Sequence, residues 1–137
     1  MTANTTNAQE QQAALEFSRE MLQFIEGSPT PFHAVANASG LLQSAGYSVP
    51  APDEDLAEGG RYLFSHNDSS LVAVSLNAPL EQGFSLVGAH TDSPCLKIKP
   101  NAAYLKDSCL QLGVEVYGGA LLSPWFDRDL SIAGRLT

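Results

Sequence analysis

Residues 87–100 read VGAHTDSPCLKIKP, a stretch that combines apolar residues with a histidine and an aspartate two positions apart. The apolar run at 84–90 predicts a strand that ends at His90, with Asp92 two positions further on. Side chains two apart in an extended segment project to the same side, so the imidazole and the carboxylate are predicted to lie together. The stretch then continues into a predicted loop that is broken by Pro100. The sequence therefore predicts a polar site at the exit of a strand.

Zinc chemistry is one use for such a pair. Neutral imidazole binds zinc through one ring nitrogen, and a carboxylate either orients a ligand or binds the metal itself. The end of a strand is also where open α/β sheets usually place their sites. A structural His–Asp pair is the commoner alternative, and a serine-type triad using Ser93 is another, although no G-x-S-x-G elbow is present. The spacing of His90 and Asp92 alone leaves these alternatives open.

Composition limits the class of protein. The chain has 137 residues, of which 44% are hydrophobic and 16% charged, as expected for one globular domain or part of a larger one. Its net charge of −8 excludes nucleic acid and anionic membranes as favoured partners. Residues 1–60 hold eight acids and one base, whereas residues 61–137 hold seven acids and six bases. This asymmetry predicts a solvated acidic face, with an acidic partner surface as the alternative.

Targeting signals and cysteine usage point to a cytoplasmic protein. The N-terminal residues MTANTTNAQEQQ have neither the basic flank nor the apolar stretch of a signal peptide, and no apolar run is long enough to span a membrane. Cys95 and Cys109 are too few for a disulfide framework, so both are predicted to be free thiols. Cys95 is interpreted as a small packed residue rather than a nucleophile.

The order of the predicted elements indicates a mixed α/β or α+β fold. A frayed tail is expected up to Glu10, followed by a helix that stops at Gly27, because apolar residues recur at helical spacing. Thr30 is predicted to cap a second helix, with Pro31 at its first position. Gly46 is predicted to end that helix. A loop at 49–60 and five strands follow, and the strands are expected at 61–66, 70–77, 84–90, 110–117 and 125–137.

Four blocks of sequence carry a resemblance to a known family. They are SPTPFHA, GRYLFSHNDSSLVAV, GAHTDSP with the following CLKIKP, and VEVYGGALLSPWFDRDLSIAGR. Together they resemble the aspartyl aminopeptidase family of zinc exopeptidases, and its bacterial members most closely. The similarity runs in order over residues 17–137.

The resemblance implies an enzyme that binds two zinc ions and removes N-terminal aspartate or glutamate from peptides. It also implies an α/β metallopeptidase domain, begun here by residues 1–98, and an inserted β-rich dimerisation domain, begun by residues 99–137. Members assemble as homo-oligomers. The family's first zinc-ligand histidine falls on His90, and the catalytic-site aspartate that orients a metal ligand falls on Asp92.

The family's other metal ligands and its catalytic glutamates fall beyond Thr137. The chain is therefore expected to be an N-terminal fragment that is inactive alone, since a dinuclear site needs more ligands and a base. A non-catalytic remnant or an assembly module of the same family is the alternative.

Structural roles are favoured for several other conspicuous residues. His33 is expected to make a hydrogen bond to a nearby turn, and His66 to lie on a surface or in a turn. Arg128 could grip an acidic substrate side chain, because a guanidinium matches a carboxylate bidentately, but a structural network with its neighbours is favoured. Those neighbours, Asp127 and Asp129, are predicted to alternate with it along a strand.

Overall fold

The N-terminal helix is longer than the sequence predicts. The computed structural model describes residues 3–136, and α1 occupies Ala3–Glu26. The predicted frayed tail up to Glu10 is therefore wrong over the described residues. Residues 8–14 are alanine, glutamine and glutamate, all good helix formers, which explains why the helix extends through them. The helix ends where predicted, and the amide of Gly27 donates to the carbonyl of Gln23 at 2.9 Å.

The second helix, α2, spans Pro31–Ser44 and confirms its predicted cap. Thr30 is extended, with φ −138° and ψ 163°, and its hydroxyl accepts a hydrogen bond from the amide of His33 at 3.4 Å. Pro31 occupies the start of the helix, where a missing N–H costs nothing. Gly46 follows the last turn with φ +87°, a left-handed conformation that favours glycine.

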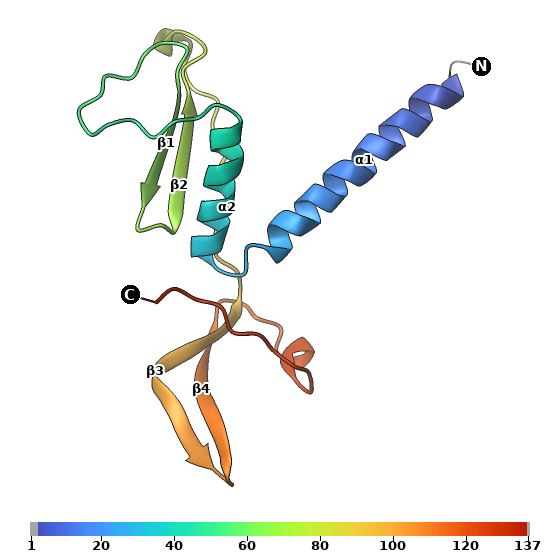
Figure 1. Cartoon of the computed structure of the whole chain (residues 1–137), viewed down its shortest axis with the longest axis vertical. Coiled ribbons are helices and arrows are strands. Elements are labelled where there is room, and N and C mark those ends of the chain that lie inside the picture. The colour runs from blue at the N-terminus through green and yellow to red at the C-terminus, as the bar shows by residue number, and fades with distance from the viewer. Residues whose placement is uncertain (1–2, 137) are drawn as a thin grey trace. The chain divides into compact units, whose positions relative to one another are not determined.

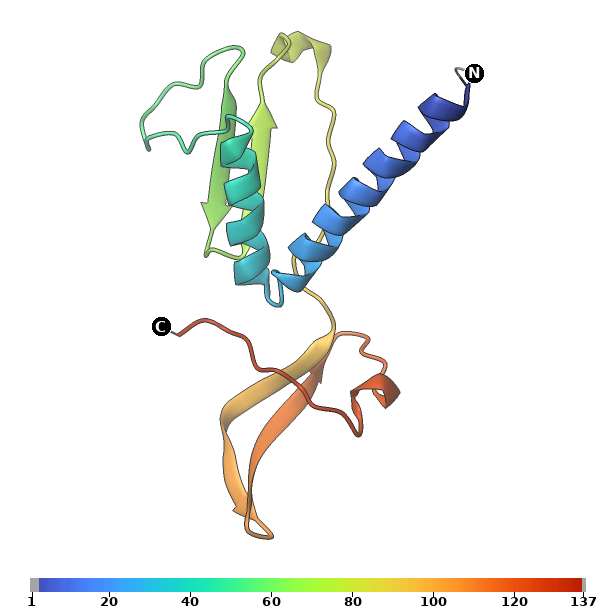
Figure 2. The ribbon, with the colours of Figure 1, turned by 45° about the vertical axis from the view of Figure 1, so that its right-hand side comes forward.

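An antiparallel hairpin, β1 (Arg61–His66) and β2 (Ser70–Ser75), follows the acidic loop as predicted. The turn of three residues between the paired residues His66 and Ser70 places Asn67 and Asp68 at φ 51° and 55°, a left-handed conformation that asparagine and aspartate tolerate. Helix α2 lies alongside this hairpin in both views (Figures 1 and 2). The small core of this part of the chain contains the buried residues Val35, Tyr62 and Leu63.

The strand predicted at residues 84–90 is absent. These residues follow a short 3-10 turn, Leu80–Gln82, and have no regular secondary structure. The reason is that a strand requires a hydrogen-bonded neighbour, and within residues 3–136 the sheet that contains β1 has only two strands. Leu86 and Val87 are 87% and 96% exposed. The apolar side chains that predicted a buried strand are therefore not covered by other described residues.

A second antiparallel hairpin replaces the predicted proline-broken loop. It consists of β3, Cys95–Lys106, and β4, Cys109–Tyr117, of which only the second was predicted. The pairing register shifts between Ile98 and Ala103, and Pro100 lies inside this irregularity. Proline has no N–H to donate to a ladder, so a strand tolerates it at a bulge of this kind.

The strand predicted at residues 125–137 is also wrong over its described part. After Gly118, with φ +68°, the chain forms a short 3-10 turn, Ser123–Trp125, and then irregular backbone. Asp127 has φ 53°, which lies outside the β region, so the alternation of Asp127, Arg128 and Asp129 along a strand does not occur.

The described residues divide between two compact units. One is the described part of Met1–Thr91 and Gly134–Thr137, and the other is Asp92–Ala133. The assignment of 1–98 and 99–137 to two domains stays a prediction. None of the helices in the described part of the chain is long and apolar enough to cross a membrane.

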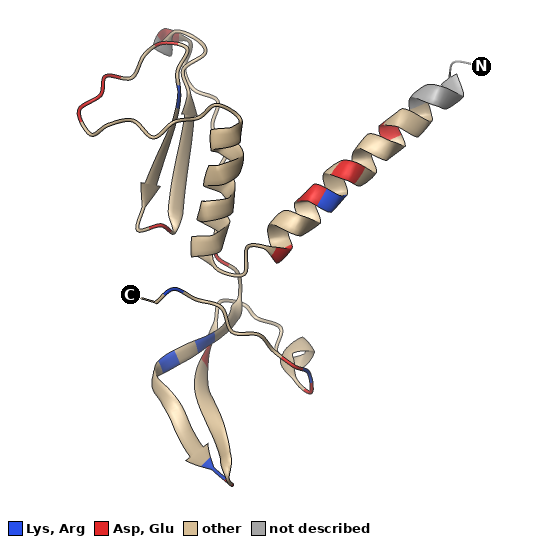
Figure 3. Cartoon of the chain, in the orientation of Figure 1, with Lys and Arg blue, Asp and Glu red and all other residues tan. Residues whose placement is uncertain are grey.

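The charge asymmetry follows the elements. Acidic residues gather on α1 and on the loop after α2, whereas all three lysines lie on β3 and the arginines are scattered (Figure 3). The carboxylates on α1 are exposed, as the interpretation of a solvated acidic face requires.

Candidate metal site

His90 ends the irregular segment after β2, and its side chain is exposed. The neighbouring residue Thr91 is anchored, because its hydroxyl donates to the carbonyl of Ser69 at 2.8 Å. Ser69 belongs to the turn between β1 and β2. The backbone that carries the imidazole is thereby held to a hydrogen-bonded hairpin, although no strand precedes it.

Asp92 begins the second unit and is half-buried. Its carboxylate oxygen Oδ2 accepts a hydrogen bond from the hydroxyl of Tyr117 at 2.7 Å. Tyr117 is the last residue of β4 and pairs with Cys95, the first residue of β3. The last residue of the second hairpin therefore places its phenol hydroxyl against the carboxylate of Asp92.

The Tyr117–Asp92 contact also changes the acidity of the phenol. The hydrogen bond to Asp92, followed by the negative charge of the same carboxylate, raises the pKa of Tyr117 above its ordinary value. Both effects favour the protonated phenol, which donates to the carboxylate, over the phenolate, which would be repelled by it. The predicted partner of Asp92 was His90, and sequence reasoning missed Tyr117. Its only sequence signal was its position at the end of a predicted strand in one of the quoted blocks.

The donor types at His90 and Asp92 fit zinc, but their number does not complete a site. Zinc in proteins takes about four ligands from imidazole, thiolate and carboxylate groups. Among the residues whose placement is described, no cluster of three or more His, Cys, Asp or Glu side chains could hold a metal ion. Both cysteines are free thiols, as predicted, with Cys95 half-buried and Cys109 exposed.

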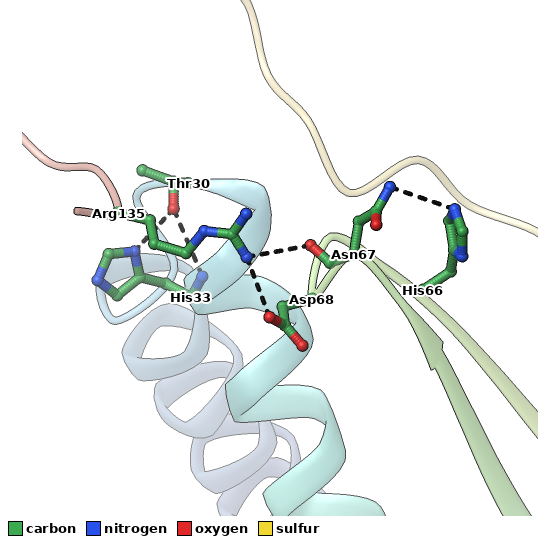
Figure 4. A network of polar contacts seen from close by, with 6 residues as sticks. All are labelled: Thr30, His33, His66, Asn67, Asp68 and Arg135. Carbon is green, nitrogen blue, oxygen red and sulfur yellow. Dashed lines mark hydrogen bonds and ion pairs between the residues drawn. The ribbon is translucent and has the colours of Figure 1, made fainter. Parts of the chain in front are cut away.

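The other two histidines have structural surroundings (Figure 4). The Nδ1 atom of His33 lies 2.8 Å from the Thr30 hydroxyl, so the side chain belongs to the helix cap, as predicted. His66 is exposed at the end of β1, and its Nε2 lies 3.2 Å from Nδ2 of Asn67. The geometry gives both histidines a role at the ends of elements rather than in a metal cluster.

Arg135, which belongs to the first unit, contacts the turn after β1 and the first turn of α2, and the sequence did not predict this role (Figure 4). Its Nη1 donates to Oδ2 of Asp68 at 3.0 Å and to the carbonyl of Asn67 at 3.3 Å. Its guanidinium also lies 4.3 Å from the centre of the Phe32 ring. The partners are 67 and 68 positions away in the sequence, which is why no local pattern could indicate them.

Arg128 is exposed in the second unit. It lines a shallow depression together with Trp125, and Pro124 and Leu130 complete the lining. This depression is a surface feature of the irregular segment. It supports neither the substrate-binding interpretation of Arg128 nor the network with Asp127 and Asp129, and both stay predictions.

Comparison with known proteins identifies the family. Residues 24–137 match the family described as aminopeptidase I zinc metalloprotease (M18). The "Probable M18 family aminopeptidase 2" of Pseudomonas paraeruginosa is 56% identical over 126 residues, which cover 89% of this chain and 29% of that protein.

Two solved structures also resemble the chain. A cryo-EM structure of the Ape4 and Nbr1 complex contains a chain with 37% identity and a TM-score of 0.73, over 80% of this chain and 22% of that one. Aminopeptidase I of Borrelia burgdorferi has the same fold, with a TM-score of 0.80 at 24% identity, over 87% of this chain and 30% of that one.

The chain thus spans about 29% of the length of the curated relatives that it matches. The match covers all four sequence blocks, including the block with His90 and Asp92. On this match, the chain belongs to the M18 family of zinc metalloproteases, the family of aminopeptidase I.

Proposed function

We propose that residues 1–137 form the N-terminal part of a zinc-dependent aminopeptidase that removes aspartate or glutamate from the N-terminus of peptides. The observation that carries this proposal is the family match, which runs through the GAHTDSP motif at 56% identity to a relative named as an M18 aminopeptidase. The specificity for acidic residues rests on the resemblance of the four sequence blocks to aspartyl aminopeptidases.

His90 is proposed as a zinc ligand and Asp92 as the carboxylate that holds a ligand in its binding orientation. A neutral imidazole binds through one ring nitrogen, and a nearby carboxylate fixes its tautomer by accepting a hydrogen bond from the N–H of the other. The complete enzyme is proposed to bind two zinc ions, which polarise the scissile carbonyl and activate a water molecule. The remaining ligands and the base are assigned to the part of the relatives that this chain does not cover.

The complete protein is further proposed to be a cytoplasmic homo-oligomer. One solved structure that resembles the chain is a complex of Ape4 with Nbr1, so that protein takes part in an assembly. The apolar side chains exposed on β3 and β4 also suit a surface that another subunit covers. This exposed surface favours one other candidate function, that of an assembly module without catalytic activity.

The proposed function is tested on the full-length protein that carries this chain. Wild-type protein is expected to release aspartate from an Asp-containing dipeptide in a zinc-dependent reaction, and His90→Ala is expected to lose both bound zinc and activity. His66→Ala is a matched control, because it removes an exposed imidazole outside the motif. A His90→Ala protein that keeps its zinc and its rate would refute the assignment.

The 137-residue chain alone is expected to release no measurable aspartate, even with added zinc, manganese or cobalt. It supplies one proposed zinc-ligand imidazole and its supporting carboxylate, and the described residues contain no cluster of three metal-binding side chains. Loss of a base or of an electrostatic stabiliser commonly costs several orders of magnitude in rate. Metal-dependent turnover by the purified chain that disappears in His90→Ala would show that other residues complete the site.

A further inference from the structure

Tyr117 reaches the motif aspartate from a different element. It closes the base of the second hairpin, where it pairs with Cys95, and its hydroxyl lies 2.7 Å from Oδ2 of Asp92. Asp92 itself lies outside every helix and strand of the structure. The orientation of its carboxylate therefore depends on side-chain contacts rather than on a backbone ladder.

The tyrosine ring is itself held in place by the hairpin. Its backbone is paired in the antiparallel ladder, and Nζ of Lys97 lies 5.7 Å from the centre of its ring. On its C-terminal side Gly118 has φ +68°, and a Cβ there would lie 3.6 Å from Pro94. The turn that follows Tyr117 thus lies close to the residue that precedes β3, which limits the movement of the phenol relative to Asp92.

We propose that Tyr117 is a positioning residue for the metal centre, because its hydroxyl fixes the orientation of the Asp92 carboxylate. This inference rests on the proposed role of Asp92 as the carboxylate that orients a zinc ligand. A phenol that donates to one carboxylate oxygen sets the rotation of the carboxylate plane, and it keeps the group as an acceptor for a ligand imidazole. Outer-shell partners of this kind tune metal affinity without touching the metal.

The rival explanation is that the contact only closes the hairpin. Cys95 and Tyr117 form the last pair of the ladder, and a Tyr–Asp hydrogen bond at that point would also stop the strand ends from separating. Tyr117 is 40% exposed, so the contribution of the bond to stability is reduced by competition with water. Measurements of stability alone do not separate the two explanations, whereas metal affinity and its coupling to Asp92 do.

The test uses the full-length protein and the variants Tyr117→Phe, Asp92→Asn and the double variant. Tyr117→Phe removes one hydroxyl and keeps the ring. It is expected to weaken zinc binding about tenfold, measured by competition with a chromophoric chelator, because loss of an outer-shell partner typically has this effect. At saturating zinc, the value of kcat is expected to fall while KM stays near the wild-type value. Tyr104→Phe, in the same hairpin, is the matched control and is expected to leave zinc affinity unchanged.

The double variant decides between the explanations. If Tyr117 acts through Asp92, the tenfold loss of zinc affinity should disappear when Tyr117→Phe is made in an Asp92→Asn protein. Equal losses in both backgrounds, or a Tyr117→Phe protein that binds zinc like the Tyr104→Phe control, would overturn the inference. Failure of the proposed function looks different, because wild-type protein would then bind no zinc or would keep its zinc in His90→Ala.

Discussion

Single hydroxyl groups hold the ends of several elements in this chain. The Thr30 hydroxyl caps α2, the Thr91 hydroxyl ties the residue after His90 to Ser69, and the Tyr117 hydroxyl holds Asp92. The first two hydroxyls pair with a backbone amide and a backbone carbonyl, and the third pairs with a side-chain carboxylate. The candidate site is thus supported by side chains, and single-residue substitutions can test each contact.

The cap at Thr30 gives the first prediction at this scale. Thr30→Ala is expected to lower the free energy of unfolding by about 1 kcal/mol, because the amide of His33 loses its acceptor at the start of α2. Thr30→Ser keeps the hydroxyl and is expected to stay within a few tenths of wild type. Urea denaturation followed by circular dichroism measures both variants. Equal stability of Thr30→Ala and wild type would show that the cap contributes nothing.

The second prediction concerns the acidity of Tyr117. Its pKa is raised by the hydrogen bond and the charge of Asp92, so the folded chain keeps the phenol proton at a pH where the unfolded chain loses it. The stabilisation is therefore fully present below the ordinary pKa of 10.0 and is lost as the pH rises through the pKa of the folded state. Asp92→Asn keeps an acceptor but removes the charge, and it is expected to move the pKa of Tyr117 down toward 10.0.

The chain contains four tyrosines, so the titration of Tyr117 requires resolved signals. Carbon-13 NMR of ring-labelled tyrosine measures each phenol separately, and Tyr117→Phe identifies the signal. The Tyr47 resonance serves as an internal control far from Asp92 in the sequence. A Tyr117 titration that Asp92→Asn leaves unchanged would show that the contact is not formed in solution.

At the scale of elements, the packing of the first unit depends on close approach at Gly60. A Cβ at this position would overlap the ring of Tyr62, which is buried and whose hydroxyl accepts a hydrogen bond from the amide of Ala57 at 2.8 Å. The acidic loop is thereby folded back onto the start of β1. Gly40 offers a contrast, because it lies within α2 and a Cβ added there would meet open space.

These two glycines give a matched pair of substitutions with opposite signs. Gly60→Ala is expected to lower the free energy of unfolding by about 1–3 kcal/mol, because the Tyr62 ring must move from its buried position. Gly40→Ala is expected to raise it by about 0.4–1 kcal/mol, since alanine restricts the unfolded chain and fits a helix. Urea denaturation of both variants measures the difference. A neutral or stabilising Gly60→Ala would contradict the close packing.

At the scale of the whole molecule, more large apolar side chains are exposed than buried among the described residues. Among the described residues only Val35, Tyr62, Leu63 and Ala102 form the buried hydrophobic set. Both hairpins are two-stranded sheets, and isolated two-stranded sheets are marginally stable in water. Leu105 and Leu110, which pair near the tip of the second hairpin, are 76% and 73% exposed.

The 137-residue chain is therefore expected to self-associate at micromolar concentration. Exposed strand edges and apolar side chains form ready surfaces for pairing with another copy. Sedimentation velocity should show species larger than the 14.6 kDa monomer, and the double substitution Leu105→Ser, Leu110→Ser should shift the distribution toward monomer. A monodisperse wild-type monomer with a cooperative melting transition would show that these residues form a self-sufficient domain.

The sequence by itself determined the elements that local chemistry controls. The cap at Thr30, the stop at Gly46 and the turn at Asn67 were all predicted, because each depends on the backbone preference of one or two residues. The family was predicted from the four sequence blocks and is confirmed by the match over residues 24–137. Zinc ligation by His90 and the role of Asp92 stay predictions from that resemblance.

Tertiary structure decided which apolar segments became strands and which side chains met. Residues 84–90 have a strand-like pattern but no pairing neighbour within 3–136, whereas β3 accommodates Pro100 because its pairing is interrupted there. The contacts of Asp92 with Tyr117 and of Asp68 with Arg135 join residues 25 and 67 positions apart. Local sequence patterns carry information over a few residues, so pairings at these separations depend on how the chain folds.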